Sequence, residues 1–126
     1  MLNQSRLVCF VATADADRAR AFYQGTLGLT LVEDGGYALV FDANGTQLRV
    51  QRVDAVAPHA YTALGWEVDD LATAVRALAA KGLDAARFPG LPLDADGIWD
   101  TPDGSRVAWF HDPDGNTLSL SQPPQS

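Results

Sequence analysis

Two stretches of the chain, DANGTQLRV (42–50) and DPDGNTLSL (112–120), align with each other without a gap. Both contain an aspartate and a glycine in a turn, followed by alternating apolar and polar residues, and the alignment places Arg49 at the position of Ser119. Such a pattern predicts a tight turn leading into a half-buried strand. The segments before each stretch also repeat in order. An internal duplication therefore constrains the fold more than any other feature.

The first half of the chain, residues 5–53, predicts the order β-α-β-β-β. An apolar run from Leu7 to Thr13 is typical of a buried strand, and a helix capped by Asp15 extends to Gly28. Three strand-like runs follow, LTLVED, YALVFD and TQLRVQRV, with an Asn-Gly hairpin signal between the last two.

The second half, residues 61–122, predicts the same order after a linker at 54–60. A strand YTALGWEV precedes a helix capped by Asp69, and further strands are expected in LDAARFP, GIWDT, SRVAWFH and TLSLSQ. We therefore expect an α+β fold, built from paired βαβββ modules within a single domain, 1–126.

Composition excludes several classes of function. The net charge of −7 argues against a nucleic-acid partner, because phosphate binding requires a basic surface. The N-terminal segment lacks the pattern of a signal peptide and is too short to span a membrane. Cys9 is the only cysteine, so no disulfide can form within the chain. We expect a cytoplasmic protein without a membrane partner.

Three segments together resemble the vicinal oxygen chelate superfamily. They are D-x-x-R-A-x-x-F-Y-x-x-x-L-G-L at 15–29, LGWEVDDL at 64–71 and FHDPDGNTLSL at 110–120. This superfamily includes glyoxalase I, extradiol dioxygenases, fosfomycin-resistance thiol transferases and bleomycin-resistance proteins. The resemblance implies two βαβββ modules whose sheets curl around an open cleft, and a homodimer that completes such clefts.

The resemblance also implies positions for a divalent metal, on the first and last strands of each module. In this chain those positions fall at Val8, Arg49, Ala63 and Ser119. None supplies the carboxylate or imidazole that such an ion prefers, and a shift of one residue would offer only Cys9. We therefore expect no metal and no cofactor.

Alternation along the strands predicts which side chains line the cleft. The predicted ligand-binding residues are Phe10, Arg49, Gln51, Glu67, Trp99, Trp109, Ser119 and Ser121. Arg49 is equally compatible with a solvated strand position and with a grip on a carboxylate or phosphate. Glu67 and His111 are the candidates for acid–base catalysis, although no residue pattern establishes that a reaction occurs.

Two functions of different class follow from these features. The first is a metal-independent protein of the glyoxalase/bleomycin-resistance type, which binds a small, planar or aromatic molecule in the cleft. The alternative is an enzyme, a lyase, isomerase or dioxygenase, that uses Glu67, His111 or atypical metal ligands. The acidic composition suits a cationic ligand whereas Arg49 suits an anionic one, so the sequence leaves the ligand's identity open.

Overall fold

The computed structural model describes residues 1–125 and divides the chain into two compact units. The first comprises Met1–Pro58 and the second begins at His59. The division falls inside the segment expected to be a linker. Each unit contains one four-stranded sheet and one main helix, which confirms the α+β prediction.

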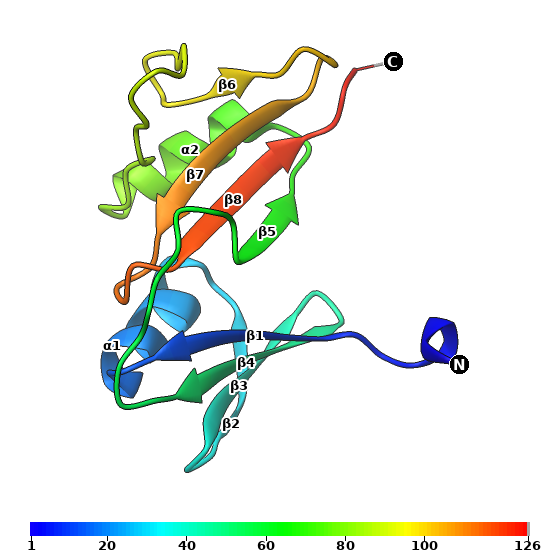
Figure 1. Cartoon of the computed structure of the whole chain (residues 1–126), viewed down its shortest axis with the longest axis vertical. Helices are drawn as coiled ribbons and strands as arrows, with labels where there is room; N and C mark the ends of the chain where they lie inside the picture. Colours follow the sequence, from blue (N-terminus) through cyan, green and yellow to red (C-terminus); the bar gives the residue numbers. More distant parts are fainter. Residues whose placement is uncertain (126) are drawn as a thin grey trace. The chain divides into compact units, whose positions relative to one another are not determined.

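The first unit has the predicted βαβββ order (Figure 1). Its strands run in the spatial order β1-β4-β3-β2, with β1 parallel to β4 and the other neighbours antiparallel. A short 3-10 turn, Leu2–Gln4, precedes the sheet. The elements are β1 (Val8–Thr13), α1 (Ala16–Arg20), β2 (Thr30–Asp34), β3 (Ala38–Ala43) and β4 (Thr46–Arg52).

The predicted first helix is present, but it changes from an α-helix to a π-helix midway. The Asp15 side chain caps it by accepting a hydrogen bond from the Arg18 N–H at 3.1 Å. After α1 the chain continues as a π-helix, Ala21–Thr26, and the segment ends at Gly28 with a positive φ of 75°. The periodicity of apolar residues predicted one continuous helix and contained no signal for the wider turn.

The Asn-Gly signal between β3 and β4 is confirmed as a two-residue hairpin. Asn44 and Gly45 have φ values of 53° and 93°, the left-handed conformation that a type I′ turn requires at both central positions. Asp42 accepts a hydrogen bond from the Gly45 N–H at 3.0 Å. The turn chemistry therefore sets the register of β3 against β4.

The second unit repeats this topology. Its strands run in the order β5-β8-β7-β6, with β5 parallel to β8, and α2 packs on β7 and β8 (Figure 1). The elements are β5 (Leu64–Glu67), α2 (Leu71–Ala80), β6 (Trp99–Asp100), β7 (Arg106–His111) and β8 (Thr117–Gln122).

Two local predictions in the second unit were wrong. The cap of α2 is Asp70 rather than Asp69, because the Asp70 carboxylate accepts the Thr73 N–H, a hydrogen bond that also lowers the pKa of Asp70. The stretch LDAARFP forms no strand, and its backbone pairs with the sheet at one isolated bridge, between Ala86 and Trp109. The prolines and glycines that follow this stretch limit further ladder pairing.

The predicted strand GIWDT contracts to the two residues of β6. Its first part instead belongs to a loop organised by Asp94, whose carboxylate accepts the N–H groups of Asp96 and Ile98. Gly97 in that loop has a positive φ of 85°, and a Cβ there would lie 2.8 Å from the Ala85 Cβ. The side chain of Asp94 thus competes with strand pairing for the local backbone donors.

Each unit builds its core on the helix-covered face of its sheet. In the first unit the largest buried side chains are Phe22, Tyr23, Leu39, Phe41, Leu48 and Val50, and in the second they are Leu71, Val75, Ile98, Phe110 and Leu118. Because side chains alternate along a strand, the residues between these point to the opposite face of the sheet. That face carries the predicted ligand-binding residues.

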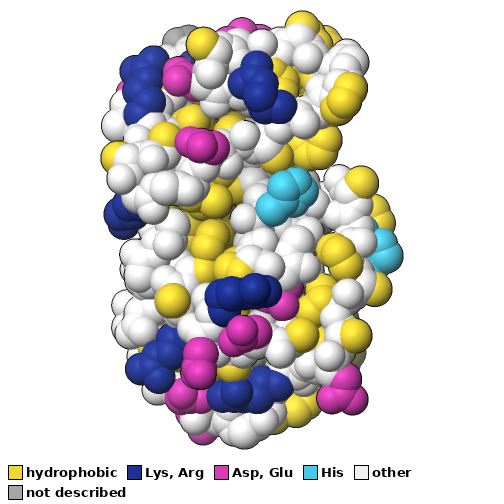
Figure 2. Space-filling view, turned by 90° about the vertical axis from the view of Figure 1, so that its left-hand side faces the viewer, with side chains coloured by type: hydrophobic (Ala, Val, Ile, Leu, Met, Phe, Trp, Pro, Cys, Tyr) yellow, Lys and Arg dark blue, Asp and Glu magenta, His cyan; other side chains and the backbone are white. Residues whose placement is uncertain are grey.

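The surface shown in Figure 2 mixes basic and acidic side chains rather than separating them. Several are paired, and Asp34 accepts from both Arg20 and Arg52 at 3.1 and 2.7 Å. Such exposed pairs contribute little to stability. Among residues 1–125, no helix is both long and apolar enough to cross a membrane.

The two repeated turns differ in burial. Asp112 is 4% exposed and its carboxylate accepts the N–H groups of Asp114 and Asn116 and the side-chain amide of Asn116. Its counterpart Asp42 is exposed and accepts only from Gly45 in the hydrogen bonds described for it. The second copy of the turn therefore depends on its aspartate more than the first copy depends on Asp42.

We predict that Asp112→Ala lowers the free energy of unfolding by about 3 kcal/mol, because buried donors lose a charged acceptor. Asp42→Ala, the matched substitution at the repeated position, is expected to cost less than about 1 kcal/mol. Urea unfolding of both variants measures the difference. Equal costs at the two positions would contradict this account of the turns.

Candidate functional site

On the face opposite its core, the first sheet carries rows that contain both polar and apolar side chains. Phe10 on β1 lies beside Arg49 on β4, which lies beside Val40 on β3. One step further along, Gln51 lies between Ala12 and Ala38. Phe10 is 47% exposed, an unusual degree for a phenylalanine in the middle of a strand.

Arg49 is held in place on this face by two neighbours. Its Nε donates to the Oε1 of Gln47 at 2.7 Å, and its guanidinium lies 5.5 Å from the centre of the Phe10 ring. No carboxylate of residues 1–58 forms an ion pair with it. The arginine is thus oriented by an amide and an aromatic ring rather than neutralised by an acid.

The second sheet presents the other predicted residues in two rows. Glu67, Ser121, Val107 and Trp99 form one row across the four strands, and Gly65, Ser119 and Trp109 form the next. A Cβ on Gly65 would lie 2.6 Å from the Oγ of Ser119, so this serine hydroxyl lies directly over the glycine. The serines of β8 therefore supply hydroxyl groups on the strand next to Trp109, whereas Glu67 lies on the edge strand opposite to that of Trp99.

Aromatic rings form a continuous series along the edge of this face. Trp99 and Trp109 stack with centroids 6.2 Å apart and an interplanar angle of 26°. Phe88 meets Trp109 edge-on at 5.5 Å and His111 at 6.4 Å. We name Phe88, Trp99, Trp109 and His111 the aromatic row.

Sequence reasoning missed Phe88, because it was placed in a predicted strand with no assigned role. Its position depends on the hydrogen bond from the Ala86 N–H to the Trp109 carbonyl, at 2.7 Å, which draws the segment against β7. The available signal was an aromatic residue next to a proline in an otherwise small-residue stretch. That signal does not reveal which strand the segment contacts.

The structure does not bring Glu67 and His111 together. Glu67 is paired in register with Ser121, whereas His111 is paired with Thr117, four residues away along β8. This separation corresponds to about 13 Å along the strand. Both side chains are exposed, so neither has the burial that tunes a catalytic acid or base. These two residues do not form an acid–base pair.

The positions expected for metal ligands do not fit a divalent ion. Val8 lies on the same face as Arg49, and Ala63 precedes β5 with its N–H donating to the Thr117 carbonyl. Valine and alanine have no donor atom, arginine carries a positive charge, and serine is a weak ligand. Among residues 1–125, no group of three or more His, Cys, Asp or Glu side chains is arranged to hold a metal.

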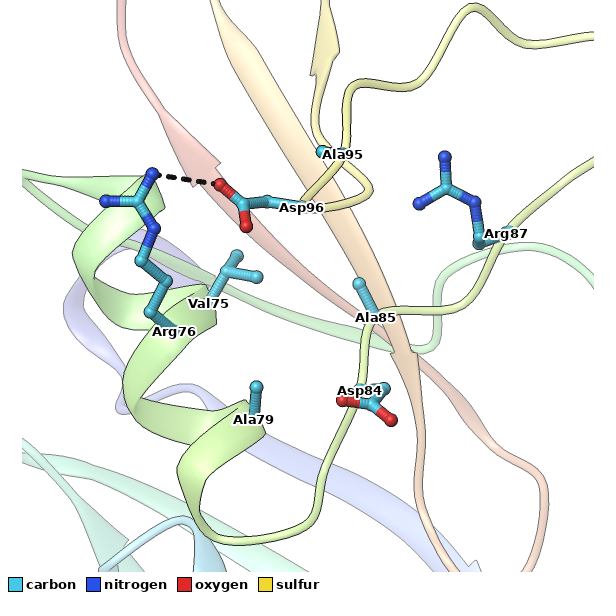
Figure 3. Close-up of a pocket in the computed structure, with 8 residues that line it drawn as sticks. All are labelled: Val75, Arg76, Ala79, Asp84, Ala85, Arg87, Ala95 and Asp96. Carbon is cyan, nitrogen blue, oxygen red and sulfur yellow. Dashed lines mark hydrogen bonds and ion pairs between the residues drawn. The ribbon is translucent and has the colours of Figure 1, made fainter.

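A separate pocket of about 320 Å³ lies on the helix side of the second unit (Figure 3). Val75 and Ala79 of α2 form one wall and the segment around Ala85 forms another. An ion pair between Arg76 and Asp96, 3.1 Å long, bridges its rim. The pocket lies on the side of the sheet opposite to the aromatic row and includes none of the predicted ligand-binding residues.

Comparison with solved structures shows the same fold in several proteins. The fosfomycin resistance protein FosX from Listeria monocytogenes is 13% identical, with a TM-score of 0.75 over 95% of this chain and 93% of its own. Lactoylglutathione lyase from Agrobacterium tumefaciens is 21% identical, with a TM-score of 0.68 over 94% and 93%. The oxidase ChaP-H2 is 25% identical, with a TM-score of 0.70 over 97% and 95%.

No curated protein matches the chain in a sequence search. The model of one protein family does match, over residues 6–120, which is nearly the whole chain. Together with the repeated βαβββ topology, this match confirms the resemblance seen in the three sequence segments. The chain belongs to the Glyoxalase/Bleomycin resistance protein/Dioxygenase superfamily.

Proposed function

We propose that the chain binds a small planar molecule against the aromatic row of the second sheet, without a metal ion. The observation that supports this most is the stacking of Trp99 on Trp109 beside the hydroxyls of Ser119 and Ser121. Half-exposed indoles offer a large flat apolar area at low cost in side-chain entropy. The flanking serine hydroxyls then orient a ligand through its polar edge.

The charge around the aromatic row favours a neutral or cationic ring over an anionic one. Glu67 is the charged side chain in the cross-strand row that contains Trp99, at the opposite edge of the sheet, and the chain as a whole carries a net charge of −7. The partners we propose are thus a small molecule and no nucleic acid. A cytoplasmic location remains our expectation from the sequence.

A catalytic role is the competing hypothesis, supported by the 25% identity to a protein described as an oxidase. The separation of Glu67 from His111 disfavours acid–base catalysis by that pair. The poor donor set at Val8, Arg49, Ala63 and Ser119 disfavours a metal-dependent reaction at the usual positions. Binding without turnover is therefore the function that the site supports best.

Binding is tested with three probes that share one ring system and differ in charge: quinoline, N-methylquinolinium and 2-naphthoate. We expect tryptophan fluorescence to be quenched saturably, most by N-methylquinolinium. Trp109→Leu is expected to weaken binding about fivefold, since a stacked aromatic contact contributes about 1 kcal/mol beyond its buried area. The folded state of each variant is verified by circular dichroism.

Trp66→Leu is the control for this experiment, because Trp66 pairs with Leu120 on the helix side of the same sheet. It is expected to leave probe affinity unchanged. If no probe quenches the fluorescence saturably, or if both variants bind as well as the unaltered protein, the aromatic row is not a ligand site.

The proposal that the ligand binds without a metal ion is tested separately. Elemental analysis of the purified protein is expected to show less than stoichiometric nickel, zinc, manganese and iron. Adding each ion is expected to leave the melting temperature unchanged, because a ligand that binds the folded state raises it by mass action. A stoichiometric metal, or a large stabilisation by one ion, would favour the enzyme hypothesis.

We also propose that the protein forms a homodimer. The edge strands β2 and β5 leave unpaired backbone groups along each sheet, and Val32 of β2 is 64% exposed. Unpaired edges and exposed apolar side chains favour association with a second copy. Light scattering is expected to give twice the mass of the 13.4 kDa chain. A monomer at high concentration would contradict this.

A further inference from the structure

A second pocket, of about 300 Å³, lies in the first unit at the start of β1 and β4. Its lining includes the guanidinium groups of Arg6 and Arg49, the amide of Gln47 and the carboxylate of Asp42. Val8 contributes part of the apolar wall. The residues that line this pocket belong to the first unit, whereas the aromatic row belongs to the second.

In this pocket the guanidinium of Arg49 is oriented to donate hydrogen bonds. Its Nε is occupied by the hydrogen bond to Gln47, and its guanidinium carbon lies 5.5 Å from the centre of the Phe10 ring. The N–H groups of Nη1 and Nη2 have no acceptor in the hydrogen bonds and ion pairs described for residues 1–58. These two nitrogens form the end of the fork that matches two oxygens of a carboxylate or phosphate.

The charge of the pocket is opposite to that of the chain. Two guanidiniums and one carboxylate line it, and the Asp42 carboxylate already accepts the Gly45 N–H at 3.0 Å. The net positive charge is thus located on Arg6 and Arg49, in a chain of net charge −7. A concave site with an excess of positive charge attracts anions selectively.

Arg49 differs from the arginines that stabilise the surface of this protein. Four others form ion pairs with aspartates: Arg20, Arg52, Arg76 and Arg106. Arg49 instead lies half-buried beside an amide and an aromatic ring, with no such partner in its unit. A half-buried cation without a carboxylate is costly unless an anion is supplied from outside.

We propose that this pocket binds the oxyanion group of a small molecule, a carboxylate or a phosphate. The group lies against Nη1 and Nη2 of Arg49, and Arg6 adds charge at the rim. The two proposals use different probes and different variants, so either one can fail without the other. The chemistry of the pocket predicts recognition of two adjacent oxygens rather than of a particular carbon skeleton.

The experiment is a nuclear magnetic resonance titration of the full-length, isotope-labelled chain with acetate and with inorganic phosphate, at constant ionic strength maintained with chloride. We expect saturable shifts of the Arg49 Nε–H and of the Gln47 side-chain amide with at least one anion. Comparing the two anions identifies whether the site prefers a planar or a tetrahedral oxyanion.

Arg49→Gln is expected to weaken anion binding about tenfold, because a charge-assisted hydrogen bond is lost. Arg49→Lys keeps the charge but not the forked geometry of the guanidinium, and is expected to weaken anion binding several-fold. Arg52→Gln is the matched control, because it removes the same charge from the same strand. Arg52 is ion-paired with Asp34. This substitution is expected to leave the affinity unchanged.

Two results would overturn the proposal. One is the absence of saturable shifts with both anions. The other is an equal loss of affinity in Arg49→Gln and Arg52→Gln, which would show a general effect of charge and no defined site. Arg49→Lys keeps the test decisive if Arg49→Gln melts at a lower temperature, because it preserves the charge and most of the side-chain packing.

Discussion

The parallel pairing of the first strand with the last strand in each unit is the constraint from which the remaining structure follows. A parallel pair cannot be joined by a tight turn, so the chain must cross over, and in both units the helix lies in that crossover. The helix covers one face of the sheet and builds the core there. The side chains on the other face of the sheet are not part of the core.

The two open faces share a backbone pattern but differ in chemistry. Arg49 and Ser119 occupy equivalent positions on β4 and β8, yet one is a charged fork oriented by Gln47 and the other a hydroxyl packed over Gly65. The residues that the two units share lie mainly in the turns and the cores. The residues that differ between the two units lie on the open faces, where one unit carries Arg49 and the other an aromatic row.

Prediction from sequence succeeded where a residue's local conformation is decided by its own chemistry. Asn44 and Gly45 tolerate the positive φ that the hairpin requires, and Asp15 caps a helix through its immediate neighbours. Prediction was less successful between Leu83 and Thr101, where one expected strand is absent and the other is reduced to β6 by a loop that Asp94 and Gly97 organise. There the outcome depends on which side-chain acceptors reach the backbone, and alternation of apolar residues carries no information about that.

By itself the sequence determined the repeated βαβββ order, the family and the face on which each strand residue lies, because periodicity and turn residues encode these locally. Only the tertiary structure decided which side chains are neighbours. It separated Glu67 from His111, added Phe88 to the two tryptophans and placed Arg49 over Phe10. Those relations arise from strand register and loop contacts between residues distant in the chain, and no short-range pattern specifies them.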